Sequence, residues 1–382
     1  MMVKDKVGII SFHKSINYGV YLQAYALQTY IEQSGYVAEI IDYNRFTEQP
    51  KRKKGAIYRI THFKETISII RMLFFLHGKG AKEKEIKFEN FAKNNFCLSN
   101  PLNSFDEIVN IEGDYEKFVC GSDQIWNPEY TQANPVYFLQ FAPEIKRIAY
   151  APSFGVERKS DAFKGYEEKY KKYIAAFADI SVREETGQGI VEDICGILPK
   201  VVVDPTLLLS ANHWEEKSKQ VKIQGKYIVF YILGSNPLYR ELAKKFFEQG
   251  EYSVICIPTG PLWDNLVCVE KCYAGVDEFI YLMRNAQYVI TDSFHGTVFS
   301  VIFKKNFSAV LRNDTEYSLC SRLRDFLKKI KLDENCVSVD KVLEIDTERI
   351  TDYRNSENIL NEWINESKEF FLSALSREKR NE

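Results

Sequence analysis

Short apolar segments alternate with longer helical segments along this chain, and this alternation constrains the fold more than any other feature. Near the start, predicted strands at 7–12 and 38–43 flank a segment of helical periodicity at 20–34. The second half repeats the order, with a predicted strand at 226–233 and a helix at 237–249. Strands that alternate with helices pair in parallel, so the sequence predicts an α/β fold.

The length of the chain points to two such units. At 382 residues it is too long for one ordinary hydrophobic core. A polar, charged stretch at about 209–224 is a plausible linker. We therefore predict domains at 1–210 and 220–345, followed by an amphipathic helix within 355–382. The loops at the carboxyl ends of both sheets would line a cleft between the two domains.

Charge and composition exclude several classes of protein. Lys and Arg number 51 against 53 Asp and Glu, which argues against a general nucleic-acid binder. No apolar run is long enough to span a membrane, and the first residues lack a signal-peptide pattern, so we expect a cytoplasmic location. The eight Cys are scattered, and no His or second Cys pair completes a zinc site, so no metal is predicted.

The turn Ser293-Phe-His295-Gly296 is the sharpest candidate for chemistry. It follows the apolar strand 288–291 and precedes a predicted helix, which places His295 where open α/β sheets bind ligands and helix N-termini attract anions. A histidine, with an ordinary pKa near ~6.5, can give or take a proton at neutral pH. The alternative is a structural histidine.

Two turns in the first half are candidates for binding. Asn17-Tyr-Gly19 follows the first strand, and its glycine would let backbone N–H groups approach a ligand. Within 121–128, Asp123 and Gln124 could bind sugar hydroxyls and Trp126 could stack on a sugar ring. The alternatives are an ordinary strand-to-helix turn and a capped loop with Trp126 in the core.

Two further strand ends carry charged residues. Arg183 would suit a carboxylate or phosphate through paired hydrogen bonds, unless Glu184 or Glu185 neutralises it. Asp204 could orient a basic group in the cleft, or form an Asx turn before Pro205.

A basic run at 51–54 precedes a helical segment that includes 67–76. Together they could contact an anionic membrane surface. The alternative is a helix packed on its own domain beside a solvated loop.

These motifs, in this order, resemble the polysaccharide pyruvyl transferase family. The resemblance spans roughly residues 7–325 and is carried by six segments: 10–12 with 17–28, Cys120-Gly-Ser-Asp-Gln-Ile-Trp-Asn-Pro128, Ile148-Ala-Tyr-Ala-Pro-Ser-Phe-Gly155, Ile180-Ser-Val-Arg-Glu184-Glu185, Val203-Asp-Pro-Thr206 and 289–300.

The resemblance implies a GT-B-like architecture of two Rossmann-like domains, with the last helix returning to the first domain. It also implies pyruvyl transfer from phosphoenolpyruvate to a sugar of a cell-surface glycan or its lipid-linked precursor, at the inner face of the membrane. Phosphoenolpyruvate would be a donor substrate, and no cofactor is implied. Two other functions stay open: a GT-B glycosyltransferase using a nucleotide-sugar, and a redirected or non-catalytic glycan-binding member.

The resemblance also assigns roles to residues. Domain 1–210 would bind the acceptor and domain 220–345 the donor. Arg183 would bind the donor's phosphate or carboxylate, and His295 would be the acid–base or would steady the leaving phosphate. The other expected contacts are Ser293, Gly296 and Arg312 for the donor, and Asn17, Gly19, Asp123, Gln124 and Trp126 for the acceptor.

One departure from the family pattern concerns the donor. Family members often carry Arg-Leu immediately before the motif histidine, whereas Ser293-Phe294 precedes His295 here. A donor-binding cation is therefore missing from this turn, and Arg312, Lys304 and Lys305 are its candidate replacements.

Overall fold

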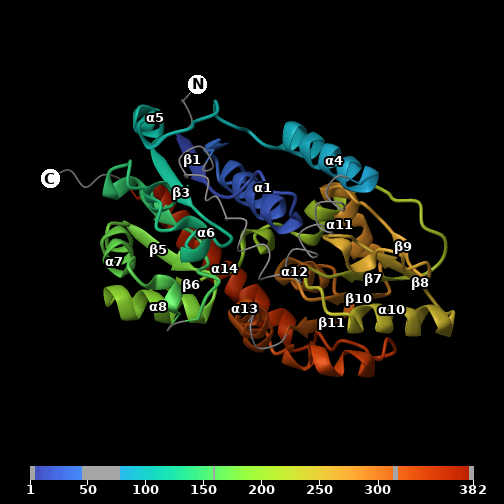
Figure 1. The fold of residues 1–382 in the computed structure, drawn as a ribbon. Helices are drawn as coiled ribbons and strands as arrows, with labels where there is room; N and C mark the ends of the chain where they lie inside the picture. Colours follow the sequence, from blue (N-terminus) through green and yellow to red (C-terminus); the bar gives the residue numbers. More distant parts are fainter. Residues whose placement is uncertain (1–4, 45–77, 158–159, 313–316, 378–382) are drawn as a thin grey trace, which may run out of the picture.

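The computed structural model describes residues 5–44, 78–157, 160–312 and 317–377. They form two α/β domains, each built on a six-stranded sheet (Figure 1). The basic run at 51–54 and the segment 67–76, considered above for membrane contact, lie outside the described residues. No helix in the described part of the chain is both long and apolar enough to cross a bilayer.

The N-terminal sheet is parallel throughout and has the order β2-β1-β3-β4-β5-β6. The order reverses between β1 and β3, so the ends of these two strands form a switch point where a crevice opens. The strands are β1 (Lys6–Ile10), β2 (Val37–Ile40), β3 (Lys117–Cys120), β4 (Arg147–Ala149), β5 (Asp179–Val182) and β6 (Lys200–Val201).

The C-terminal sheet is also parallel, with the order β12-β11-β10-β7-β8-β9. Counted from β7, this is the 3-2-1-4-5-6 order of a Rossmann fold, and its switch point lies between β7 and β10. The strands are β7 (Tyr227–Tyr231), β8 (Ser253–Cys256), β9 (Glu270–Lys271), β10 (Tyr288–Thr291), β11 (Asn306–Leu311) and β12 (Cys336–Ser338).

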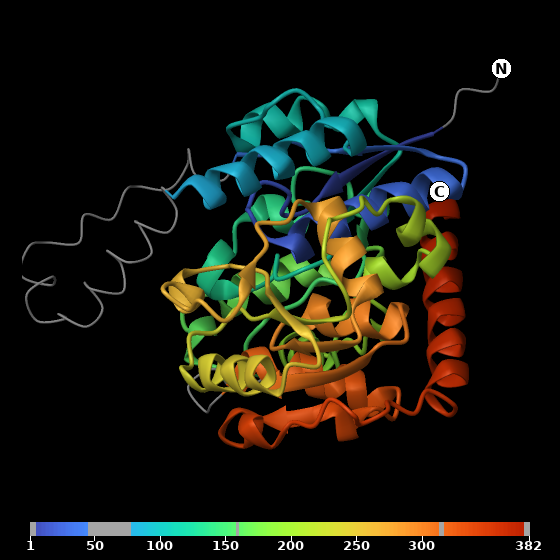
Figure 2. The ribbon, with the colours of Figure 1, turned by 90° about the vertical axis from the view of Figure 1, so that its right-hand side faces the viewer.

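Helices connect these strands and cover the sheets (Figures 1 and 2). The helix after β1 is buried on nearly every side, as expected of a helix enclosed by a core. The α-helices are α1 (Tyr18–Gln33), α4 (Lys79–Asn95), α5 (Phe105–Val109), α6 (Pro128–Thr131), α7 (Glu167–Ala175), α8 (Glu185–Cys195), α9 (Ala211–Glu216), α10 (Leu238–Gln249), α11 (Val276–Asn285), α12 (Phe294–Ile302), α13 (Tyr317–Lys329) and α14 (Ser356–Ser376).

One cluster of the hydrophobic core spans both domains, and each domain also has a cluster of its own. A single cluster of buried side chains includes Ile9 of the N-terminal sheet and Val229 of the C-terminal sheet. Tyr18 of α1 stacks on Phe279 of α11 with ring centroids 4.4 Å apart, and its hydroxyl donates to the carbonyl of Ala274 at 2.7 Å. The seam therefore resembles the inside of a domain more than a wet interface between domains.

The last helix runs along both domains and ends on the N-terminal one (Figure 2). Trp363 donates its indole N–H to the carbonyl of Val201 at 2.9 Å. The backbone N–H of Val203 donates to Ser367 Oγ at 3.0 Å, and Phe371 stacks on Tyr150. The helix thus covers the β6 side of the N-terminal sheet.

Candidate active site

A cavity of about 250 Å³ lies between the two switch points. Its lining comes from both domains, as expected if the strand ends of two sheets face each other. The N-terminal domain contributes Phe12, Ser15, Asn17, Val20, Asp123, Gln124 and Tyr130, and the C-terminal domain contributes Leu233, Asp292, Ser293, Phe294, His295, Arg312, Arg322 and Leu323.

The turn after β10 is rigidly held. Ser293 caps α12, its Oγ accepting from the N–H of Gly296 at 3.4 Å. Asp292 accepts from the N–H groups of Leu233 and Gly234 at 2.6 and 2.8 Å, which joins this turn to the loop after β7. Burial raises the pKa of the Asp292 carboxyl. These bonds place His295 in the first turn of α12, facing the N-terminal domain.

The buried carboxylate of Asp204 joins the two domains. Its Oδ2 accepts from Arg183 Nη1 at 3.0 Å and Ser122 Oγ at 3.1 Å, and it lies 3.5 Å from His295 Nε2. Its Oδ1 accepts from the N–H and hydroxyl of Thr206 at 3.1 and 2.8 Å. Both sequence interpretations of Asp204 therefore apply, since one oxygen forms the Asx turn and the other faces basic groups.

The charge of Asp204 is strongly stabilised. Burial alone would raise the pKa of its carboxyl, but His295 and Arg183, with the Thr206 hydrogen bond, hold that pKa well below its usual range. Asp204 is therefore ionised at neutral pH. It can orient the imidazole and offer a negative charge to an imidazolium, the part that the carboxylate plays in a Ser-His-Asp triad.

Arg183 lies one layer behind the cavity wall. Its guanidinium carbon is 4.5 Å from the centroid of the Phe294 ring, and its side chain is almost fully buried. Burial would lower the pKa of Arg183, but Asp204, Glu184 and Asp123 outweigh that effect and raise it. Arg183 is not among the residues that line the cavity. Its geometry supports holding Asp204 and Phe294, and does not support the direct donor contact that we expected.

Several polar atoms around Asp204 remain unsatisfied. Within the described part of the chain, Arg183 Nε and Nη2, Glu184 Oε2 and His295 Nε2 are buried without an aligned hydrogen bond. Orphaned buried polar atoms are rare in folded proteins, and clusters of them are typical of functional sites.

The acceptor-side predictions have mixed outcomes. Asn17, Asp123 and Gln124 line the cavity. Trp126 does not, because its side chain is fully buried, stacked on Phe138, with its indole N–H bonded to the carbonyl of Tyr137 at 3.1 Å. The predicted stacking of Trp126 on a sugar is therefore wrong, and the alternative of a core tryptophan is correct.

Neither predicted glycine offers its N–H to a ligand. The N–H of Gly19 donates to Asn17 Oδ1 at 2.9 Å, and the N–H of Gly296 donates to Ser293 Oγ at 3.4 Å. Gly19 instead makes room for the catalytic candidate, because a Cβ at this position would lie 2.1 Å from His295 Nδ1. At Gly296 a Cβ would lie 2.3 Å from Thr291 Oγ1. Close packing, not backbone donation, explains both glycines.

Comparison with known families now assigns the chain. The family model for polysaccharide pyruvyl transferase matches residues 17–314. The match includes the Asn17–Gly19 turn after β1, Asp204 and the turn that carries His295. The chain belongs to the polysaccharide pyruvyl transferase family. It is therefore a transferase of polysaccharide biosynthesis. None of the curated proteins matches it in sequence.

Solved structures confirm the predicted GT-B-like fold of this transferase. The UDP-GlcNAc 2-epimerase of Methanocaldococcus jannaschii is similar at a TM-score of 0.52 and 14% identity, over 92% of this chain and 95% of that chain. The UDP-GlcNAc 2-epimerase of Neisseria meningitidis, bound to UDP-GlcNAc, is similar at a TM-score of 0.50 and 12% identity, over 97% of this chain and 99% of that chain. At such identities the likeness concerns the fold alone.

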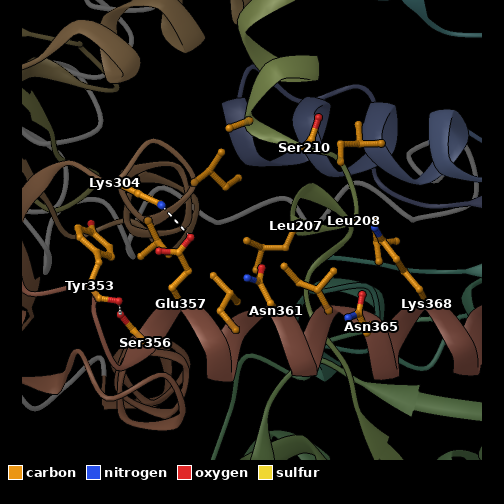
Figure 3. Close-up of a pocket in the computed structure, with 16 residues that line it drawn as sticks. Leu207, Leu208, Ser210, Lys304, Tyr353, Ser356, Glu357, Asn361, Asn365 and Lys368 are labelled. Atoms are coloured by element: carbon orange, nitrogen blue, oxygen red, sulfur yellow. Dashed lines mark hydrogen bonds and ion pairs between the residues drawn. The ribbon is translucent and has the colours of Figure 1, made fainter.

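The replacements considered for the missing family arginine lie in different places. Arg312 lines the cavity of this transferase, with its Nε 3.7 Å from Asp292 Oδ2. Lys304 lines a separate cavity of about 530 Å³, where it pairs with Glu357 at 2.9 Å (Figure 3). Lys305 donates to the carbonyl of Arg284 at 2.9 Å. Of these three residues, Arg312 alone lines the cavity between the two switch points.

The larger cavity is not the catalytic candidate. It lies where α14 passes the ends of α9 and α12, and Figure 3 shows side chains such as Leu207 and Asn361 facing it. None of the predicted catalytic, donor-binding or acceptor-binding residues lines it, although Lys304, one of the candidate replacements for the missing arginine, does.

Arg322 is a cavity residue that the sequence did not reveal. It lies on α13, within a segment whose only sequence signal is amphipathic periodicity, and beyond the residues matched by the family model. Nothing in the local motif distinguishes it from Arg324, which is exposed on the same helix.

Proposed function

We propose that this transferase moves the pyruvyl group of phosphoenolpyruvate onto two hydroxyls of a sugar, forming a ketal. The sugar would belong to a cell-surface polysaccharide or to its lipid-linked precursor. In the reaction, the methylene carbon of phosphoenolpyruvate gains a proton, and the adjacent carbon becomes oxocarbenium-like. One sugar hydroxyl adds to that carbon, phosphate leaves, and the second hydroxyl closes the ring. The two hydroxyl protons balance the added proton and the proton carried away with phosphate.

The size of the cavity is the observation that favours this donor. Pockets for drug-sized ligands are typically about 300–1,000 Å³, whereas this cavity has about 250 Å³. A compact donor such as phosphoenolpyruvate suits that volume better than a nucleotide-sugar. The cavity also holds Arg312 and Arg322 beside the N-terminus of α12, as a small polyanion requires.

The residues suggest a division of labour. His295 would protonate the methylene carbon or bind the leaving phosphate, with Asp204 fixing its ring. Arg183 would keep Asp204 in place and support Phe294. Asn17, Asp123 and Gln124 form the N-terminal wall and would bind acceptor hydroxyls.

The location of the reaction follows from the proposed acceptor. Lipid-linked precursors are assembled at the inner face of the membrane, so we propose that the enzyme works in the cytoplasm near that surface. Whether it also contacts the membrane is tested by flotation with vesicles that contain anionic lipid.

The deciding experiment measures phosphate release from phosphoenolpyruvate against a panel of lipid-linked and nucleotide-linked sugars. We expect release that depends on one acceptor class, and a rise in melting temperature with phosphoenolpyruvate alone, because a native-state ligand stabilises the fold. Stabilisation by a nucleotide-sugar but not by millimolar phosphoenolpyruvate would instead support the glycosyltransferase alternative. Acceptor binding with neither response would support a redirected glycan-binding protein.

A further inference from the structure

Three arginines from different elements converge on this site, and their environments differ. Arg183 is held by Asp204 at 3.0 Å. Arg312 lies 3.7 Å from Asp292. Arg322 lines the cavity with only 7% of its surface exposed, and no acidic side chain in the described ranges forms an ion pair with it. Its Nε is buried without a hydrogen-bond partner among these residues.

An unpaired guanidinium in such a place is unfavourable without a ligand. Removing a cation from water is strongly unfavourable unless a partner compensates for the lost hydration. Burial, helped by the charges of Arg183 and Arg312 and opposed by those of Glu184 and Asp123, lowers the pKa of Arg322 to about 10. Buried charges with a strongly shifted pKa cluster at functional sites, and an anionic ligand would complete the environment of this one.

The geometry of the cavity indicates which anion. Arg322 shares the wall with Ser293 and with the first turn of α12. The first N–H groups of a helix have no acceptor within the helix and favour phosphate. A guanidinium presents two parallel donors to the same kind of group. Although Ser293 caps the N–H of Gly296, the cation and the start of the helix would therefore both suit a phosphate group.

We propose that Arg322 binds the phosphoryl group of the donor and replaces the cation that family members carry at the position of Ser293. This inference rests on the proposed function for the identity of the donor. It assigns the missing charge to α13, outside the matched residues 17–314, and so to a different element of the same domain.

Calorimetric binding of two probes tests the proposal: phosphoenolpyruvate and inorganic phosphate. The proteins are the wild type, Arg322→Gln, Arg322→Lys, and the control Lys328→Gln, which removes one positive charge from the exposed face of the same helix. A charged hydrogen bond contributes enough that Arg322→Gln should weaken both probes roughly 10- to 100-fold. Arg322→Lys should be intermediate, and Lys328→Gln should equal the wild type.

Thermal unfolding separates binding from a structural role. Without a ligand, Arg322→Gln should be at least as stable as the wild type, because it removes an unpaired buried charge. With phosphoenolpyruvate, the wild type and Lys328→Gln should gain the most stability, Arg322→Lys less and Arg322→Gln the least. A ligand-free loss of stability with unchanged affinity would show that Arg322 is structural and overturn the proposal.

Other outcomes separate the inference from the proposed function. If Arg322→Gln weakens phosphoenolpyruvate binding but leaves inorganic phosphate binding unchanged, Arg322 binds the carboxylate and the phosphoryl assignment is wrong. If the wild type binds phosphate through Arg322 but does not turn over phosphoenolpyruvate, the anion site stands and pyruvyl transfer fails. Equal phosphoenolpyruvate affinity in wild type and Arg322→Gln removes Arg322 from donor binding while leaving the proposed function in place.

Discussion

At the scale of single residues, the site depends on His295 meeting Asp204 across the domain seam. The imidazole and the carboxylate come from different domains, and their atoms lie 3.5 Å apart. The sequence motif around each residue does not predict this contact. The chemical behaviour of each side chain therefore depends on the other side chain, which lies in the other domain.

Replacing His295 by Ala should reduce phosphate release from phosphoenolpyruvate by about 10²–10⁴-fold, the range typical of a lost general acid. The fold should survive, because His295 Nε2 has no aligned hydrogen bond to any of the described residues. The check is turnover together with thermal unfolding and phosphoenolpyruvate binding. Wild-type turnover in a folded His295→Ala protein would remove this residue from the mechanism.

Replacing Asp204 by Asn should destabilise the protein by about 3–5 kcal/mol at neutral pH, since it breaks a buried ion pair. The pKa of Asp204 is lower in the folded state than in the unfolded state, so its stabilisation is present above the ordinary aspartate pKa and is lost as the pH falls below it. The gap in urea-derived free energy of unfolding between the two proteins should therefore narrow below about pH 4. A gap that stays constant down to pH 3 would contradict this.

At the scale of elements, the close approach of α1 to α12 positions His295. Gly19→Ala would place a methyl group 2.1 Å from the imidazole, so the ring or the helix must move. We expect a loss of about 1–3 kcal/mol in stability. Turnover should also fall more than it does in a control variant with alanine at an uncrowded glycine. The matched control is Gly113→Ala, where an added Cβ meets nothing within 4 Å. Equal turnover in the two variants would show that Gly19 does not position His295.

The sequence predicts elements well where their patterns are local. Alternating apolar and helical segments identify the parallel sheets, and the strand ends correctly predict that His295, Asp123 and Asn17 share one cavity. The two-residue strand β9 and the short helix α9 were missed, because neither is long enough to show a period.

The misses at the site have a common physical cause. Trp126 and Arg183 lie in motifs next to the cavity. Tertiary packing buries Trp126 in the core and places Arg183 behind Phe294. Arg322 comes from a helix without a motif. Sequence spacing tells which loops meet at a strand end, but not which side chains of those loops face the ligand.

At the scale of the whole molecule, the two domains behave as one packed body. Lys84 of α4 reaches across the seam, where its Nζ donates to the carbonyl of Pro258 at 3.0 Å and lies 4.4 Å from the Tyr18 ring centroid. Such a seam leaves little room for the domains to open, so the donor and the acceptor sugar would enter through the mouth of the cavity.

The buried amine of Lys84 predicts how stability depends on pH. Burial lowers its pKa to about 7 in the folded state, from an ordinary value of 10.5. Between these values the unfolded chain binds the extra proton, so the free energy of unfolding should rise as the pH increases from about 7 to about 10. Urea unfolding should show this rise in the wild type and in the exposed-lysine control Lys82→Met. In Lys84→Met the free energy of unfolding should rise less over this pH range. The same rise in Lys84→Met as in the wild type would refute the assignment to Lys84.

The path of α14 has a consequence for how the chain is organised. The N-terminal sheet is built from the first half of the chain, yet its outer layer near Val201 is completed by Trp363 and Ser367. The C-terminal domain is therefore an insertion within the N-terminal one, and both described ends of the chain lie on the same domain. A mechanical load applied at residues 5 and 377 would be borne by the N-terminal domain first, and His295 would lie in the domain that is loaded later.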